Sequence, residues 1–244
     1  MHIKLTNLHM LTYFKKKIKM SLFVTYSKTD GVYNLTLAGF TALVIIMSAI
    51  LLAGCAVFGK NKRIGAKQLV FSAMAIALAT VTSFIKLFSL PMGGSVTLLS
   101  MLFIVLIGYW YGVGPGLTAA VAYGILQLVT NPYIVSLPQM LVDYIFAFGA
   151  LGLAGVFANK KYGLVKGYIV AVIGRFFFAV LSGVVFFAAY APVTIGNKTI
   201  DALIYSVTYN GSYLAVEGII TIIVISIPPV KKALDYVKQM ATSR

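Results

Sequence analysis

Acidic residues are scarce in this sequence, which has 5 Asp and Glu against 20 Lys and Arg and a formal net charge of +15. Charged residues of either sign make up only 10% of the 244 residues, whereas they make up about a quarter of an ordinary soluble domain. Hydrophobic residues reach 60%, and the mean hydropathy is +0.96. The composition therefore excludes a typical soluble protein and predicts that most of the chain lies in lipid.

The chain has a single cysteine, Cys55, so an internal disulfide framework and a multi-cysteine metal site are excluded. Its context, Leu52-Ala53-Gly54-Cys55, is similar to the cleavage box of a bacterial lipoprotein. A cleavable signal has a basic segment directly before a short apolar core, whereas here a long apolar run follows an uncharged stretch. We therefore interpret this segment as small residues within a transmembrane helix.

Motifs for catalysis and metal binding are also missing. The sequence has no Gly-x-x-x-x-Gly-Lys-Ser/Thr phosphate loop, no His-Glu-x-x-His metal motif and no Gly-x-Ser-x-Gly nucleophile elbow, and its two histidines are His2 and His9. An enzyme would lack its general base. We expect no catalytic residue, no metal and no cofactor, and no hydrolysis of ATP by this chain alone.

The positive charges stand in short clusters between apolar runs instead of forming one basic face. This arrangement argues against nucleic acid as a partner and indicates topology signals at the surface of a lipid membrane.

Seven apolar segments have about the length that a membrane-spanning helix needs, roughly 20 residues for ~30 Å of hydrocarbon. They are 37–58, 67–89, 96–112, 115–130, 137–157, 167–190 and 206–227. The third and fourth are short and are separated only by Gly112-Val113-Gly114-Pro115, a cluster typical of a tight turn.

The sequence thus predicts an all-α integral membrane protein, a six-helix bundle with one additional N-terminal transmembrane helix. Its parts are an N-terminal leader (1–33), the extra helix (34–60), a six-helix membrane domain (67–230) and a basic tail (231–244).

Positive charge predicts the orientation of the spans. If all seven segments cross, three clusters fall on one side, and the loops on the other side contain only Lys198 and Asp201. The clusters are Lys60, Lys62, Arg63 and Lys67; Lys160, Lys161 and Lys166; and Lys231, Lys232 and Lys238. We predict a multi-pass protein of a bacterial cell membrane with a cytoplasmic C-terminus.

A fourth basic cluster, Lys15, Lys16, Lys17 and Lys19, would lie outside and conflicts with this orientation. A start at Met20, an amphipathic leader on the inner side, or a first segment that does not cross would each remove the conflict. The sequence does not choose among these alternatives.

Four ionisable side chains fall within the predicted spans: Lys86, Asp143, Arg175 and Glu217. Each costs roughly 2.5–3.5 kcal/mol near the bilayer centre, so each needs a partner or a function. At 1.5 Å per residue, Asp143 lies about 9 Å below the outer end of its span and Glu217 about 16 Å below its own.

Two neighbouring helix faces bring Arg175 and Glu217 together. Asn210, Tyr213 and Glu217 share one face of the last span, and Arg175, Ala179, Ser182 and Phe186 share one face of the span before it. We favour a buried salt bridge with a structural role for this pair.

Asp143 is followed by Tyr144 and comes shortly after Tyr133 and Gln139. A carboxylate among aromatic rings in a medium of low dielectric constant suits an organic cation, which gains ionic and cation–π attraction. An ion pair between Asp143 and Lys86 is the equally weighted alternative.

Small residues recur in the first core span at Ala73, Ala75, Ala77 and Ala79. Such spacing allows close approach of another helix, either within the bundle or from a separate membrane subunit.

Several motifs resemble the thiamine-specific S component of energy-coupling factor transporters, in the same order and spacing. They are Leu90-Pro-Met-Gly-Gly-Ser-Val-Thr97, Gly124-Ile-Leu-Gln-Leu-Val129, Pro132-Tyr-Ile-Val-Ser136, Val142-Asp-Tyr-Ile-Phe-Ala-Phe-Gly-Ala-Leu-Gly-Leu-Ala-Gly155 and Tyr205-Ser-Val-Thr-Tyr-Asn-Gly-Ser-Tyr213. The resemblance runs from about Gln68 to Val230.

This resemblance implies a six-helix core that binds thiamine from the outer side and works with a transmembrane coupling subunit and two cytoplasmic ATPases. It also implies that the alanine-rich face contacts the coupling subunit. The ligand-contacting positions that it implies are Tyr133, Asp143, Tyr144, Tyr205 and Asn210, with Phe187 where a stacking tryptophan can stand.

Two departures concern the substrate. Asp143 stands where the family can have Glu, and Ala179 stands where it can have a ligand-facing His. Loss of that histidine predicts weaker binding or a preference for a related pyrimidine or thiazole. In addition, Tyr205 and Asn210 are about 140° apart on an ideal helix, so either Tyr205 precedes the helix or one of the two is not a contact.

We weigh two other functions against that of a substrate-capturing subunit. A stand-alone, proton-coupled permease for thiamine or a related precursor would use Asp143 or Glu217, but six core spans without a visible inverted repeat are few for alternating access. An intramembrane enzyme or structural subunit is the third reading, and as an enzyme it would need a nucleophile–base pair that the sequence lacks.

Overall fold

The computed structural model describes residues 22–27, 32–39, 41–42, 45, 65–187, 191–192, 195 and 197–243. Most of the predicted leader and most of the extra helix, including Cys55 and the lysines at 15–19, lie outside these residues. Near the N-terminus, strands β1 (Val24–Ser27) and β2 (Val32–Leu35) form an antiparallel pair.

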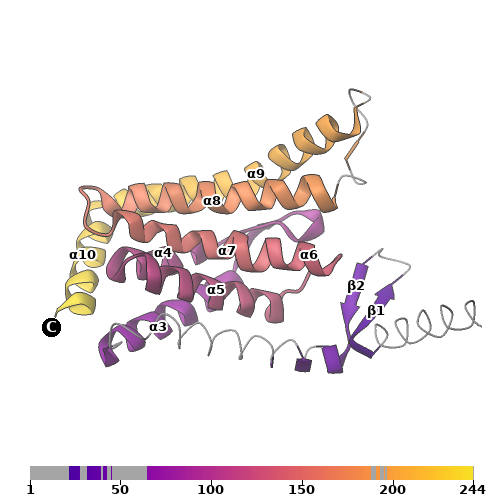
Figure 1. Ribbon diagram of the computed structural model, residues 1–244. Helices are drawn as coiled ribbons and strands as arrows, with labels where there is room; N and C mark the ends of the chain where they lie inside the picture. Colours follow the sequence, from indigo (N-terminus) through magenta and orange to yellow (C-terminus); the bar gives the residue numbers. More distant parts are fainter. Residues whose placement is uncertain are drawn as a thin grey trace, which may run out of the picture.

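The rest of the described chain is a bundle of helices that run mostly side by side (Figure 1). Its long helices are α3 (Ala66–Ser83), α4 (Ser100–Tyr111), α5 (Val113–Thr130), α8 (Gly163–Phe186) and α9 (Lys198–Ser226), together with a composite helix over Leu137–Phe157. Five of these six are long and apolar enough to cross a membrane, and α4 is a shorter apolar helix. The predicted all-helical membrane fold is confirmed.

The composite helix changes its winding along its length. It begins as α6 (Leu137–Met140), continues as a π-helical turn, η3 (Leu141–Phe146), and passes through α7 (Ala147–Gly149) into the 3₁₀-wound η4 (Ala150–Phe157). Stretches of π-helix are rare and occur frequently at functional sites. Asp143 and Tyr144 both lie in this π-helical turn.

The predicted second span was too long, because its last residues form a strand. α3 ends at Ser83, and β3 (Lys86–Ser89) pairs with β4 (Ser95–Thr97) in an antiparallel hairpin. The connecting turn contains Pro91, and Met92 and Gly93 have φ of 61° and 91°. Two consecutive residues with left-handed φ after a proline favour a tight turn of the backbone over continuation of the helix.

The tight turn predicted between the third and fourth spans is present at Gly112, whose φ is 90°. Beyond it, glycines let the backbones of α4, α5 and η4 touch. A Cβ atom on Gly116 would stand 2.7 Å from the Cα of Gly108 and 2.8 Å from the carbonyl oxygen of Gly152. Glycine is therefore required where these three helices cross.

α8 shows how the bundle separates its polar interior from lipid. Ile173, Phe177, Leu181 and Val185 are exposed at intervals of four residues and form an apolar stripe on its outer face. Ser182, on the opposite face, is only 1% exposed. An apolar stripe turned outward is what a lipid environment requires.

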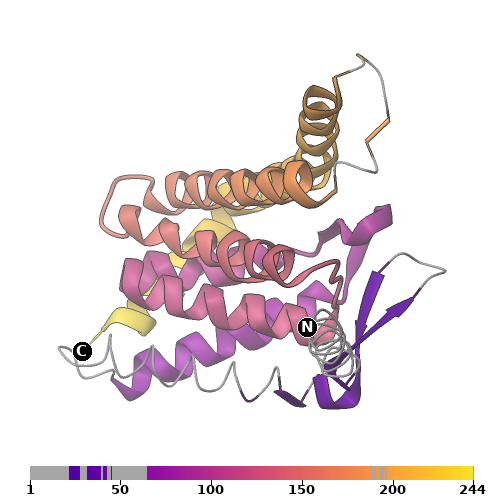
Figure 2. The same cartoon turned by 45° about the vertical axis from the view of Figure 1, so that its right-hand side comes forward.

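The last helix, α10 (Pro228–Thr242), is not part of the bundle. Pro228 and Pro229 end α9 and change the direction of the chain, and α10 then crosses the end of the bundle at which α3 begins (Figures 1 and 2). This end is opposite to the β3–β4 hairpin.

We predict that Gly124→Ala destabilises the bundle by about 1–3 kcal/mol, because it overpacks a filled site. A Cβ atom there would lie 1.9 Å from the carbonyl oxygen of Tyr144. Thermal unfolding in detergent measures the effect. Gly218→Ala is the matched control, since its nearest neighbour lies 3.9 Å away. Equal melting temperatures for the two variants would contradict the prediction.

Candidate substrate-binding site

A cavity of about 150 Å³ lies inside the hairpin end of the bundle, between the β3–β4 hairpin, α5, η3, α8 and α9. It is smaller than the roughly 300 Å³ at which sites for drug-sized ligands begin. All six predicted ligand contacts line it: Tyr133, Asp143, Tyr144, Phe187, Tyr205 and Asn210. The structure therefore gathers in one place side chains that are up to 77 positions apart in the sequence, from Tyr133 to Asn210.

Charge in this cavity comes from three side chains, Asp143, Arg175 and Glu217. When all three are ionised, two carboxylates face one guanidinium, and one negative charge is left over. The cavity is thus electrostatically suited to a ligand with one positive charge.

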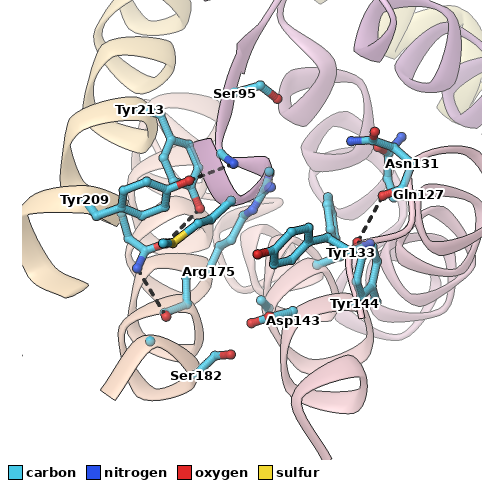
Figure 3. Close-up of a pocket in the computed structure, with 18 of the residues that line it drawn as sticks. Ser95, Gln127, Asn131, Tyr133, Asp143, Tyr144, Arg175, Ser182, Tyr209 and Tyr213 are labelled. Atoms are coloured by element: carbon cyan, nitrogen blue, oxygen red, sulfur yellow. Dashed lines mark hydrogen bonds between the residues drawn. The ribbon is translucent and has the colours of Figure 1, made fainter. Parts of the chain in front are cut away.

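The Asp143 carboxylate is held at the cavity wall by Gln139. The Gln139 side chain donates to Asp143 Oδ2 at 2.5 Å and to the Tyr133 carbonyl at 3.1 Å, and its Oε1 accepts from the Val135 amide at 3.0 Å. Ser182 lies on the same side of the cavity (Figure 3), and its buried hydroxyl is close enough to interact with the Asp143 carboxylate. These groups leave Asp143 with capacity to accept further hydrogen bonds.

Aromatic rings surround this carboxylate. Tyr133 stacks on Phe187 with centroids 6.0 Å apart and planes 22° apart, and Tyr144 stacks on Phe148 at 6.2 Å. The Tyr144 hydroxyl accepts from the Tyr133 amide at 2.8 Å and donates to the Asn131 carbonyl at 3.0 Å. The loop that carries Tyr133 is therefore fixed to the π-helical turn.

The salt bridge predicted between Arg175 and Glu217 is not formed in the described part of the chain, although both side chains line the cavity. Glu217 instead accepts from the Thr97 amide at 2.8 Å and from Thr97 Oγ1 at 2.9 Å. The Arg175 guanidinium lies 4.1 Å from the centroid of the Phe148 ring. The prediction failed because β4, which supplies the partner of Glu217, was not expected.

The alternative ion pair between Asp143 and Lys86 is also not formed among the described residues. Lys86 is exposed in β3, and the described partner of Asp143 is Gln139. Asp143 therefore remains directed at the cavity.

Tyr205 lies inside α9, not before it, and both Tyr205 and Asn210 line the cavity. The Tyr205 hydroxyl reaches the sulfur of Met92 at 3.6 Å, so this ring enters the cavity beside the hairpin. Asn210 is buried, with its Nδ2 donating to the Ser206 carbonyl at 2.9 Å and its Oδ1 accepting from the Tyr213 hydroxyl at 2.9 Å. The longer side chain of Tyr205 and the shorter side chain of Asn210 thus reach one cavity from different faces of α9.

Tyr209 is a cavity residue that the sequence analysis missed. Its hydroxyl accepts from the Gly94 amide at 2.9 Å and donates to the Pro91 carbonyl, and its ring stacks on Tyr205 at 5.9 Å. Figure 3 shows Tyr209 and Tyr213 across the cavity from Tyr133 and Tyr144. The signal was present, because Tyr205, Tyr209 and Tyr213 are four residues apart and share a helix face.

The four alanines predicted to form one interface do not share a face. Ala75 and Ala79 are 3% and 0% exposed and pack inside this chain, whereas Ala73 and Ala77 are exposed. Residues two positions apart on a helix point in nearly opposite directions. Only Ala73 and Ala77 are available to a separate subunit.

Residues 69–236 match the family model described as "Thiamine transporter protein (Thia_YuaJ)". The chain is 35% identical over 170 residues to the thiamine transporter ThiT of Bacillus subtilis (strain 168), a match that covers 64% of this chain and 84% of that protein. Its fold is similar to a solved structure of ThiT from Listeria monocytogenes, with a TM-score of 0.54 and 27% identity over 66% of this chain and 94% of that one.

We predict that Tyr209→Phe loosens the hairpin, because the loss of one hydroxyl removes both of its bonds to the turn at residues 91–94. The expected cost is about 0.5–1.5 kcal/mol for each bond lost. Hydrogen–deuterium exchange of the peptide that spans residues 86–97 should be faster than in the unmodified chain. Tyr236→Phe, on the exposed side of α10, is the control. Unchanged exchange in the Tyr209 variant would show that the hydroxyl does not hold the hairpin.

Proposed function

Because the chain belongs to the thiamine transporter family, we propose that it is the high-affinity thiamine-binding subunit of an ATP-driven uptake transporter of the energy-coupling factor type, with Asp143 as the counter-ion of the vitamin. In this proposal residues 67–230 are the substrate-binding domain and the segment 34–60 adds a transmembrane helix. Capture takes place at the outer side of the bacterial cell membrane. The observation that carries the proposal is a cavity that Asp143 shares with several aromatic rings and in which two carboxylates accompany one guanidinium.

Thiamine carries one permanent positive charge on its thiazolium ring, and it also has an aminopyrimidine and a hydroxyethyl group. The charge matches the ionisable groups of the cavity, which are two carboxylates and one guanidinium. Arg175 acts on both carboxylates through space, and Glu217 in addition accepts hydrogen bonds from Thr97. Asp143 is then the carboxylate left to attract the thiazolium or to accept from the amino group. A charge-assisted bond of this kind is about twice as strong as a neutral one.

The aromatic residues supply flat surfaces for the two rings of the ligand. Tyr133 and Phe187 are already parallel, and Tyr205 and Tyr209 form a second stacked pair across the cavity. Offset stacking and cation–π contacts each contribute about 0.5–2 kcal/mol. We assign Asn210 and Ser182 to hydrogen bonding with the polar groups of the vitamin.

Entry of a vitamin requires movement of the cavity wall, because the volume is small for such a ligand. The β3–β4 hairpin is the wall that moves in our proposal. It is joined to α9 by the Tyr209 hydroxyl and by the bonds between Thr97 and Glu217. Movement of a covering loop is a common way to admit a ligand and then exclude water.

Ala179 and Phe187 define the specificity of this site. Ala179 lines the cavity and offers no side-chain hydrogen bond where a histidine can stand in the family, so we expect lower affinity than a histidine-containing site would have. Phe187 keeps a stacking surface and lacks the indole N–H of a tryptophan.

The partners in this proposal are a transmembrane coupling subunit and two cytoplasmic ATPases, since the sequence has no phosphate loop of its own. The exposed Ala73 and Ala77 on α3 are the proposed contact with the coupling subunit. They lie beside exposed apolar residues of the same helix, which are Leu69, Val70, Met74, Leu78 and Val81. The basic end of the bundle, with α10, faces the cytoplasm in this orientation.

We predict that Asp143→Asn weakens thiamine binding roughly ten- to a hundredfold, because the loss of a charge-assisted bond costs about 1.5–3 kcal/mol. Calorimetry with the purified, detergent-solubilised chain measures the effect. Intrinsic fluorescence is less suitable, since Trp110, the one tryptophan of the chain, is not among the cavity residues.

Asp235→Asn is the matched control, because it makes the same chemical change on the exposed side of α10, at the other end of the bundle. It should leave thiamine affinity unchanged. Equal affinity in the Asp143 and Asp235 variants would overturn the role of Asp143, and the absence of thiamine binding to the folded, unmodified chain would overturn the substrate.

A second experiment separates the proposed transporter type from a proton-coupled permease. Cells that express this chain with a coupling subunit and two ATPases should take up thiamine, and inactivation of the ATPases should abolish uptake. Uptake by this chain alone, driven by a proton gradient, would contradict the proposed mechanism while leaving thiamine as the substrate.

A further inference from the structure

The end of the bundle opposite to the cavity is closed by α10, which is fixed there by specific contacts. Lys238 Nζ donates to the Ala158 carbonyl at 3.0 Å and lies 3.8 Å from the centroid of the Tyr109 ring. The Tyr111 hydroxyl donates to the Ala241 carbonyl at 3.2 Å. At the beginning of α3, Lys67 Nζ donates to the Ser243 carbonyl at 3.0 Å. α10 therefore has a defined position across the ends of the membrane helices (Figure 2).

Five other lysines at this end are exposed: Lys160, Lys161, Lys166, Lys231 and Lys232. None of them forms a salt bridge with a carboxylate among the residues described. Asp235 is the one acidic residue on α10, and the acidic residues of the cavity lie at the opposite end of the bundle. This surface therefore carries a local excess of positive charge that the described residues do not neutralise.

Tyr162 brings two of these lysines together from different segments. Lys161 Nζ lies 5.4 Å and Lys231 Nζ 5.8 Å from the centroid of its ring. Tyr162 directly precedes α8 with φ of 56°, in the left-handed region, and its side chain is 61% exposed. A non-glycine residue in this conformation needs support from its surroundings, and cation–π contacts with two ammonium groups supply some of it.

We propose that Tyr162, Lys161 and Lys231 form a binding site for the phosphate of an anionic phospholipid such as phosphatidylglycerol. Lys160 and Lys232 stand next to these lysines in the chain and add to the positive field. Ammonium groups bind a phosphate as point charges, and a tyrosine at the membrane surface contacts the headgroup with its apolar ring in lipid.

A lipid fits this surface better than a soluble anion does, because the site lies where apolar helices end. α8 begins directly after Tyr162, and α9 ends at Ser226, shortly before Lys231. Exposed apolar side chains continue along the same end at Ile227, Tyr236 and Met240. A phospholipid satisfies both kinds of surface, since its phosphate meets the lysines while its acyl chains run along the outer faces of the helices.

Native mass spectrometry of the detergent-purified full chain tests the proposal, with added phosphatidylglycerol or phosphatidylcholine. The unmodified chain should bind phosphatidylglycerol more tightly. Lys161→Gln with Lys231→Gln should weaken that binding roughly ten- to thirtyfold, about fivefold for each lysine, with phosphatidylcholine binding unchanged. The charge-preserving pair Lys161→Arg and Lys231→Arg should retain the preference.

Lys86→Gln is the matched control, since Lys86 is an exposed lysine at the hairpin end. Equal loss in this variant would show a non-specific charge effect, and a preference that survives in the paired Gln variant would overturn the site. Thiamine binding by calorimetry reports folding, because these lysines are not among the cavity residues. Should the pair fail to fold, each single Gln variant should still lose about fivefold.

A protein partner at this surface would give a different result. If the paired Gln variant bound phosphatidylglycerol normally and failed to co-purify with a coupling subunit or ATPase, the lysines would serve protein contacts and the lipid site would be refuted.

Discussion

The bond between Glu217 and the Thr97 amide connects two parts of the structure that are far apart in the sequence. Glu217 lies in α9, and Thr97 is the last residue of β4, so this contact joins the hairpin to α9 as one wall of the cavity. A buried carboxylate would be costly without such partners, because its charge is poorly solvated. The backbone amide and the hydroxyl of one threonine supply most of its hydrogen bonds. The position of the whole hairpin, and with it the wall of the cavity, depends on this carboxylate.

Because Glu217 is bound by Thr97, the other two charged side chains of the cavity have different contacts. Arg175 lies over the Phe148 ring and acts on both carboxylates through space, without a direct salt bridge to either among the described residues. Asp143 is held by the neutral Gln139 side chain, which orients it without adding a charge. A direct ion pair would have used up the charge that a cationic ligand needs. Among the described residues, Asp143 therefore lines the cavity without a direct salt bridge.

Much of the fold could be predicted from the sequence, because apolar runs of about 20 residues have few alternatives to membrane helices. The six residues predicted as ligand contacts all line one cavity, although the motif that Asp143 and Tyr144 belong to contributed more to this prediction than their periodicity. Strand β3 of the hairpin could not be predicted from hydropathy, since its residues Leu87 and Phe88 continue the apolar character of α3. Because the hairpin was not expected, Arg175 was predicted as the partner of Glu217 in place of Thr97. Ala75 and Ala79 were assigned to an external interface because spacing alone does not show which face of a helix is inside.

The π-helical turn at Leu141–Phe146 has a consequence for how the length of this span can vary. A π-helical turn holds one residue more than an α-helical turn, so removing one residue there would let the turn wind as an ordinary α-helix and would leave Gly152 and Gly155 close to their contacts with α4 and α5. A deletion between this turn and Gly152 would instead turn all later residues by about 100° and would break those contacts. The π-helical turn is therefore the place where this span can shorten by one residue and keep its helix crossing, although Asp143 and Tyr144 would then change their direction.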